Sequence, residues 1–202
     1  MQVKYIVGID EVGRGPIAGP VAVCAFVMRE DFIFSGPEYD KLPKLKDSKK
    51  LSAKQRESWF EFLKKQKDLG LCDYAVSFVS SDNIDKFGIV KCIQKALDSA
   101  LLNLLKTSEL EPSNYNLMLD GGLKAPAEYI NQETIIRGDE LHPVISMASI
   151  MAKVTRDRVM TKFGLEYPGY GFENHAGYGT KAHYEAIKKY GQASIHRKTF
   201  IH

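Results

Sequence analysis

The sequence predicts an α/β fold organised around one mixed β-sheet. Two observations carry this prediction. Short runs rich in β-branched and aromatic residues alternate along the chain with longer segments that repeat apolar residues at helical spacing. No internal repeat, low-complexity tract or persuasive domain boundary interrupts the alternation, so residues 1–202 are expected to form a single domain.

The predicted strands are short apolar runs that stop at turn-forming or acidic residues. The second one alternates most clearly, because Val21, Val23, Ala25 and Val27 would share one face. In chain order, the predicted strands are Val3–Ile9, Val21–Met28, Leu71–Val79, Tyr115–Leu119 and Thr134–Arg137. The segment Arg29–Lys50 contains two prolines and no periodic pattern, which predicts a loop.

The predicted helices combine apolar stripes with capping signals. Ser52 and Gln55 form a capping box before the first helix, while Thr180 and Gly191 bound the last one. The predicted helices are Leu51–Lys67, Ile89–Lys106, Val144–Phe163 and Lys181–Tyr190.

Composition excludes several classes of protein. Apolar residues make up 44% of the chain and charged residues 26%, with a formal net charge of +3, which excludes a disordered or collagen-like chain. No apolar run reaches the roughly 18 to 20 residues that span a bilayer, and the N-terminus has no signal-peptide pattern. Cys24, Cys72 and Cys92 form no C-x-x-C pair, so neither a disulfide framework nor a cysteine zinc site is expected. These features predict a cytoplasmic protein without membrane contact.

Acidic residues follow three of the predicted strands. Asp10 and Glu11 follow the first, Asp120 the fourth and Asp139 the fifth. Ligand sites of open α/β sheets cluster at strand ends, and carboxylates gathered there repel one another unless a cation neutralises them. Such oxygen ligands suit Mg²⁺ or Mn²⁺, and two such ions can promote phosphodiester hydrolysis. The pattern favours a metal-dependent nuclease, while an Asp-Gly pair after a strand is equally typical of a plain turn.

The segment Gly13–Gly19 joins the first two predicted strands. Its glycines would let backbone N–H groups approach an anion, which is one interpretation, and a simple Gly/Pro turn is the other. The glycine spacing matches neither a P-loop nor a dinucleotide-binding fingerprint.

An ordered series of motifs resembles the bacterial-type ribonuclease HII family. The longest is Gly8-Ile9-Asp10-Glu11-Val12-Gly13-Arg14-Gly15-Pro16-Ile17-Ala18-Gly19-Pro20-Val21. It is followed by Asp47–Ser52, Asp120-Gly121, Gly138-Asp139, Ser146–Asp157, Tyr167-Pro168, His175–Thr180, His183 and His196-Arg197. The resemblance implies a ribonuclease H-like fold, with a five-stranded mixed sheet flanked by helices. A C-terminal helical segment, about residues 165–202, would pack on this catalytic domain.

The resemblance also implies an activity. Such an enzyme hydrolyses the RNA strand of RNA–DNA hybrids and incises on the 5′ side of single ribonucleotides embedded in duplex DNA, leaving 3′-hydroxyl and 5′-phosphate ends. Asp10, Glu11, Asp120 and Asp139 match the four family carboxylates that hold two Mg²⁺ or Mn²⁺ ions, with Asp10 as the bridging ligand. A monomer is expected, because no apolar stripe is left over for an interface.

Four further positions match residues that read the substrate. Gly13, Arg14 and Gly15 match the motif that recognises the 2′-hydroxyl through backbone groups, and Tyr178 matches a tyrosine that packs on the next sugar. Without the resemblance, Tyr178 would be interpreted as surface packing in a glycine turn.

Basic residues are expected to contact phosphates. Lys49, Lys153 and Arg197 are the candidates, although any single basic residue is more often solvated surface. Asp157 is a rival metal ligand, but Arg156-Asp157-Arg158 within a helix is better interpreted as a solvated charge triplet.

Three alternative functions stay open. The first is a ribonuclease HIII-type nuclease, which cuts hybrids but handles single ribonucleotides poorly; Arg14-Gly15-Pro16 argues against it. The second is a non-catalytic module that binds RNA–DNA hybrids, which the four intact acids disfavour. The third is a nucleotide-phosphate binder that uses Gly13–Gly19 and would have measurable affinity for free ATP or GTP.

The small net charge hides an uneven distribution. Residues 41–67 carry ten Lys or Arg and three acidic residues, a net +7, and residues 181–202 carry five and one, a net +4. The rest of the chain therefore sums to −8 and contains the four candidate metal ligands. Basic segments suited to a phosphate backbone thus flank an acidic centre that needs cations.

Overall fold

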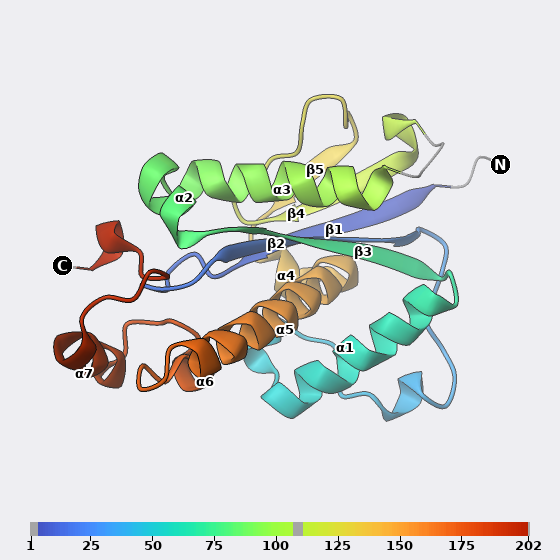
Figure 1. Ribbon diagram of the computed structural model, residues 1–202. Coiled ribbons are helices and arrows are strands. Elements are labelled where there is room, and N and C mark those ends of the chain that lie inside the picture. Colours follow the sequence, from blue (N-terminus) through green and yellow to red (C-terminus); the bar gives the residue numbers. More distant parts are fainter. Residues whose placement is uncertain (1–3, 107–110, 202) are drawn as a thin grey trace.

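A five-stranded mixed sheet forms the centre of the computed structural model, which describes residues 4–106 and 111–201 (Figure 1). The strands are β1 (Tyr5–Val12), β2 (Val21–Arg29), β3 (Cys72–Val79), β4 (Tyr115–Asp120) and β5 (Gln132–Ile135). Their order is β3-β2-β1-β4-β5. β1 pairs antiparallel with β2 and parallel with β4, and β5 extends the parallel half. The predicted mixed sheet is confirmed.

Helices cover both faces of this sheet, as Figure 1 shows. The helices are α1 (Ala53–Asp68), α2 (Ser81–Phe87), α3 (Ile89–Leu105), α4 (Gly138–Leu141), α5 (Pro143–Glu166), α6 (Phe172–His175) and α7 (Lys181–Tyr190). α3 packs on one face and α1 and α5 on the other. The alternation of β2 explains both layers, because Val23 joins the core under α3 while Phe26 joins the core under α5.

α5 lies unusually close to the sheet at Gly8 in the middle of β1. A Cβ atom on this residue would overlap the backbone carbonyl of Val144 in the first turn of α5. The absence of a side chain therefore lets the helix N-terminus approach the strand that carries Asp10.

The C-terminal segment packs on the end of α5 through a small apolar cluster of its own. Met160 from α5 and Ala18 from the glycine-rich loop meet Phe172, Ala186 and Ile195 in this cluster. Residues 170–197 are thereby held against the loop that follows β1.

The boundaries of β1 and β5 differ most from the predictions, each for a local reason, while those of β2, β3 and β4 agree to within one residue. β1 continues through Asp10 and Glu11 to Val12, because β2 offers backbone partners along its whole length. β5 ends two residues earlier than predicted, and Arg137 then turns the chain with a left-handed φ of 59°. The predicted first residue of β1, Val3, lies outside the described residues.

The helices largely follow the predictions. The capping box of Ser52 and Gln55 is present, and Thr180 accepts a hydrogen bond from the His183 backbone N–H. Sequence periodicity missed α2, α4 and α6, which have only four to seven residues each. No helix among the described residues combines the length and the apolar character needed to cross a membrane.

Candidate active site

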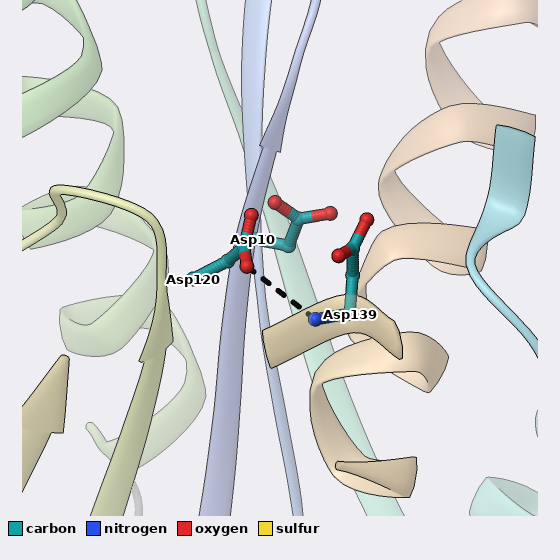
Figure 2. Close-up of side chains that lie close together, drawn as sticks. All are labelled: Asp10, Asp120 and Asp139. Carbon is teal, nitrogen blue, oxygen red and sulfur yellow. Dashed lines mark hydrogen bonds between the residues drawn. The ribbon is translucent and has the colours of Figure 1, made fainter. Parts of the chain in front are cut away.

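Two neighbouring strands and one short helix bring three aspartates together. The parallel register pairs Ile9 with Leu119, so the next residues, Asp10 and Asp120, lie at adjacent positions of β1 and β4. Asp139 comes from the first turn of α4, directly after β5. Figure 2 shows the three carboxylates gathered, with one oxygen from each within 4.8 Å of the others. The Asp139 N–H donates to Asp120 Oδ1 at 3.4 Å, and this bond links α4 to the end of β4.

Burial and mutual repulsion disfavour the charged form of these carboxyl groups. Asp10 is only 5% exposed, and burial raises its pKa well above the ordinary value, assisted by the charges of Glu11, Asp120 and Asp139. A hydrogen bond from the Ser149 side chain offsets part of that rise. Burial, Asp120 and then Asp47 raise the pKa of Asp139 to about 6. The cluster therefore holds more negative charge than its surroundings neutralise at neutral pH.

Glu11 carries an unpartnered oxygen beside this cluster. Its Oε2 atom is buried and has no hydrogen-bond partner in the described part of the chain, while Oε1 lies 3.6 Å from Arg14. Burial, followed by the charge of Asp120, raises the pKa of Glu11. An orphaned carboxylate oxygen next to three converging carboxylates is the donor set that a hard divalent cation fits.

A shell of serines and one further aspartate supports the cluster. Ser48 Oγ and Ser149 Oγ are 2.8 Å apart, and Ser149 in turn bonds Asp10. Ser146 Oγ donates to the Asp139 carbonyl at 2.6 Å. Asp47 is buried and accepts from the Lys49 backbone N–H at 2.9 Å. None of these supports is a predicted site residue, although the motifs Asp47–Ser52 and Ser146–Asp157 contain them all.

Backbone bonds from the C-terminal segment hold the glycine-rich loop after β1. The Gly177 carbonyl accepts from the N–H groups of Ile17 and Ala18 at 2.9 and 3.2 Å. On the other side, Gly19 N–H donates to the Ile195 carbonyl at 2.8 Å. The tip stays open, because Gly15 is exposed and only the Tyr178 ring approaches it, 3.9 Å from where a Cβ would stand.

Comparison with known proteins identifies the family. A family model described as Ribonuclease HII matches residues 7–202. The chain belongs to the ribonuclease HII family. It is 42% identical over 195 residues to the ribonuclease HII of Endomicrobium trichonymphae, covering 96% of this chain and 84% of that one. The ribonuclease HII of Clostridioides difficile is 41% identical over 197 residues, covering 98% of this chain and 70% of that one.

A solved structure places the fold in the same family. The ribonuclease H2 of Pyrococcus horikoshii OT3 superposes with a TM-score of 0.72 at 27% identity, covering 96% of this chain and 93% of that chain. The predicted ribonuclease H-like fold is confirmed. Family membership makes the protein a divalent-metal-dependent endonuclease of the ribonuclease H type that acts on RNA–DNA substrates, as the sequence predicts.

The structure gives Arg197 a different place from the expected phosphate contact. The side chain is fully buried, and its guanidinium donates to the carbonyls of Gly13, Arg14 and Gly19 at 2.7, 3.1 and 2.9 Å. A guanidinium committed to three carbonyls has no free face for a phosphate. Arg197 instead fixes the backbone of the glycine-rich loop from the protein interior.

Arg156 does the same from α5, so its interpretation as a solvated residue is wrong. It is fully buried and donates to the carbonyls of Ala18, Pro20 and Ala176. Gly13, with a φ of 87°, is required here, because a Cβ atom would collide with the Arg156 side chain. Burial lowers the pKa of both arginines, and no carboxylate of the described residues lies within salt-bridge distance of either.

Four other predicted site residues, Lys49, Lys153, Arg14 and Tyr178, lie near the surface. Lys49 is exposed, with Nζ 4.0 Å from Asp139 Oδ2, so it lies at the edge of the carboxylate cluster. Lys153 pairs with Asp157 at 2.8 Å on α5. Asp157 is therefore paired with a lysine and is not one of the three clustered aspartates, Asp10, Asp120 and Asp139. This agrees with its interpretation as a charged residue near the surface. Arg14 and Tyr178 are both exposed.

Substitution of Arg197 by lysine tests its role in the loop. An ammonium cannot reach three separated carbonyls, so we expect the free energy of unfolding in urea to fall by about 2–4 kcal/mol. The salt dependence of hybrid binding should keep its slope, because no phosphate contact is lost. Arg158→Lys, on the exposed face of α5, is the control and should cost under about 1 kcal/mol. A flatter salt dependence with unchanged stability would instead restore Arg197 as a phosphate contact.

Protonation of Asp139 provides a second test, in metal-free protein. The pKa of Asp139 is about 6 in the folded protein and 3.8 ordinarily, so as the pH falls the folded state binds a proton before the unfolded state does. The free energy of unfolding therefore rises as the pH falls from above 6 towards 4. Asp139→Asn removes the charge, and we expect its melting temperature at pH 7.5 to exceed that of the native protein by a few degrees, roughly 2–6 °C. The difference should shrink at pH 5, where native Asp139 is protonated. A calorimetric difference that is absent at pH 7.5, or that grows at pH 5, would contradict the repulsion argument.

Proposed function

We propose that this chain cleaves the RNA strand of RNA–DNA hybrids and incises on the 5′ side of single ribonucleotides embedded in duplex DNA, leaving 3′-hydroxyl and 5′-phosphate ends. The observation that carries the proposal is the convergence of Asp10, Asp120 and Asp139, with the orphaned oxygen of Glu11 beside them. Such a cluster favours phosphodiester hydrolysis with divalent cations over acyl-transfer chemistry, which needs a nucleophile and a base.

The four carboxylates Asp10, Glu11, Asp120 and Asp139 would hold two Mg²⁺ or Mn²⁺ ions. When bound, these ions supply an activated water and neutralise the charge that develops on the leaving oxygen. Asp10 is central and buried, so it is the residue proposed to serve both ions. Ser149 orients its carboxylate, and Ser146 fixes the backbone that carries Asp139.

The glycine-rich loop is proposed to recognise the ribonucleotide. The N–H groups of Arg14 and Gly15 have no acceptor among the described residues, and both residues are exposed. They can therefore bond a 2′-hydroxyl, the group that separates RNA from DNA at a single position. Arg156 donates to the Ala18 carbonyl and Arg197 to those of Gly13 and Arg14, so two buried side chains hold the backbone of the same loop.

Tyr178 is proposed to contact the next sugar along the strand. Its ring lies beside Gly15, so the two features would read adjacent nucleotides. A flat ring packs closely on a deoxyribose and leaves little room for a 2′-hydroxyl. Lys49 and Lys153, together with the basic segment 41–67, would follow the phosphate backbone.

A nicking assay with end-labelled duplex DNA that contains one ribonucleotide tests this function. We expect a single cut 5′ of the ribonucleotide in the presence of Mg²⁺, no cut of the same duplex without the ribonucleotide, and none with EDTA. Asp10→Asn keeps the shape of the side chain but removes a ligand charge, so activity should fall about 1,000-fold or more while hybrid binding persists.

Asp98→Asn is the matched control for that variant. Asp98 is exposed on α3, across the sheet from the cluster, where it accepts a hydrogen bond from Gln94, so the same change should leave the rate unaltered. Normal cutting by Asp10→Asn would refute the assignment of the site. Cleavage of a hybrid without cleavage at the single ribonucleotide would instead indicate the ribonuclease HIII type.

A further inference from the structure

Three histidines lie behind Tyr178, outside the proposed chemistry. His183 on α7 and His196 in the C-terminal segment are 0% and 1% exposed. The His175 ring of α6 stacks on His183, with centroids 4.4 Å apart, and Phe172 packs edge-on at 5.3 Å. These rings do not converge as metal ligands, since the described residues place only Asp10, Asp120 and Asp139 in such a group.

The hydrogen bonds of this cluster assign one tautomer to each buried ring. His196 Nδ1 lies 2.8 Å from the Ala193 backbone nitrogen and 3.1 Å from the Ala193 carbonyl oxygen; the shorter contact, in which the Ala193 N–H donates, assigns Nδ1 as an acceptor without a proton. The neutral His196 ring is then protonated at Nε2, which lies 3.0 Å from His183 Nε2. His183 Nε2 must accept this bond, so His183 carries its proton on Nδ1 and donates to the Tyr178 carbonyl at 2.9 Å. The result is a directed chain from Ala193 through two imidazoles to Tyr178.

Burial supports the neutral form that this chain requires. Burial lowers the pKa of His183 to about 4 and also lowers that of His196. A proton added to His183 would place two N–H donors against each other across the 3.0 Å contact, and one added to His196 at Nδ1 would oppose the Ala193 N–H. The surroundings described above are aromatic rings and backbone groups, which offer no compensating charge.

The chain ends at the point where the two substrate-reading features meet. Tyr178 follows Gly177, whose carbonyl holds Ile17 and Ala18 of the glycine-rich loop. His196 forms an isolated antiparallel bridge with Ala18, on the other side of the same loop. The contacts therefore form a closed ring. It runs from the glycine-rich loop to Gly177 and Tyr178, then to His183 on α7, and through His196 back to the loop.

We propose that His183 and His196 are positioning residues, a neutral imidazole relay that sets the Tyr178 ring against the Gly13–Gly15 loop and thereby determines selectivity for a ribonucleotide followed by a deoxyribonucleotide. This inference rests on the proposed function of Tyr178 and of the loop. The relay touches neither substrate nor the carboxylates, so it acts on which nucleotide pair is accepted and leaves the hydrolytic step unchanged.

Two substitutions at His183 separate the relay from simple packing. In His183→Gln, the amide reaches the former Nε2 position and can still accept from His196, but the donor to the Tyr178 carbonyl is lost. In His183→Asn, the amide matches Nδ1 and keeps that donor while it loses His196. Asn is one methylene smaller than Gln, so His183→Asn leaves the larger void at this buried position, and a purely structural role predicts the larger loss for that variant.

The measurement is kcat/KM on duplex DNA with one ribonucleotide, divided by kcat/KM on an RNA–DNA hybrid. The backbone N–H of Thr180 also donates to the Tyr178 carbonyl at 2.8 Å, so the loss in His183→Gln should be moderate. We expect that variant to lower the ratio about five-fold, through a higher KM for the single ribonucleotide. His183→Asn should stay within about two-fold of the native ratio. Equal ratios for both variants, at matched urea stability, would overturn the relay.

A spectroscopic readout tests the relay independently of activity. Long-range ¹H–¹⁵N spectra of the imidazole rings should show His183 protonated only at Nδ1 and His196 only at Nε2 between pH 6 and 8. Any other tautomer, or a protonated ring in this range, would contradict the assignment. If the native enzyme does not cut at a single ribonucleotide, the proposed function fails while these spectra still decide the relay.

Discussion

The parallel pairing of β1 with β4 is the constraint on which the rest of the site depends. More than 100 residues separate the two strands along the chain, yet the register from Tyr5 with Tyr115 to Ile9 with Leu119 sets Asp10 beside Asp120. A slip of one residue would turn one of the two carboxylates to the opposite face of the sheet. Val7 and Leu117, buried under α3, hold the register through apolar packing. The core on one face of the sheet thus determines where the charges meet on the other.

That convergence opposes folding, and local polar contacts only partly offset it. The Glu11 N–H donates to Asp10 Oδ1 at 2.8 Å, and Ser149 bonds the same carboxylate. The Glu11 oxygen keeps no partner among the described residues, and the pKa of Asp139 stays near 6. Apolar packing on both faces of the sheet offsets the unfavourable free energy of gathering these charges. The energetic conflict is itself what makes the site selective for cations, because any cation that neutralises the cluster also stabilises the fold.

Sequence reasoning succeeds where the decisive interaction is local and fails where it is distant. The capping box from Ser52 to Gln55 spans four residues, and the alternation of β2 is visible within nine, so both are predictable. Arg156 sits between an acid and another arginine, the pattern of a solvated surface, yet its partners lie 20 to 138 positions away. Its three acceptors are backbone carbonyls, which every residue has. The sequence therefore cannot indicate which carbonyls the folded chain brings to this side chain. The three aspartates could be assigned together because each follows an apolar run that predicts a strand.

Covalent continuity links the two halves of the proposed site. Glu11 is the penultimate residue of β1, and Gly13 begins the loop proposed to read the ribonucleotide, so one residue separates the proposed metal ligand from the proposed recognition element. The sheet fixes Glu11 through its pairing with Val23, while Arg156, Arg197 and the C-terminal segment fix the loop. Under the proposed function, backbone geometry and not flexible side chains would set the distance between the 2′-hydroxyl and the phosphate to be cleaved. The proposed selection of the nucleotide by the C-terminal segment would therefore leave the positions of the carboxylates unchanged, because the sheet and not that segment fixes them.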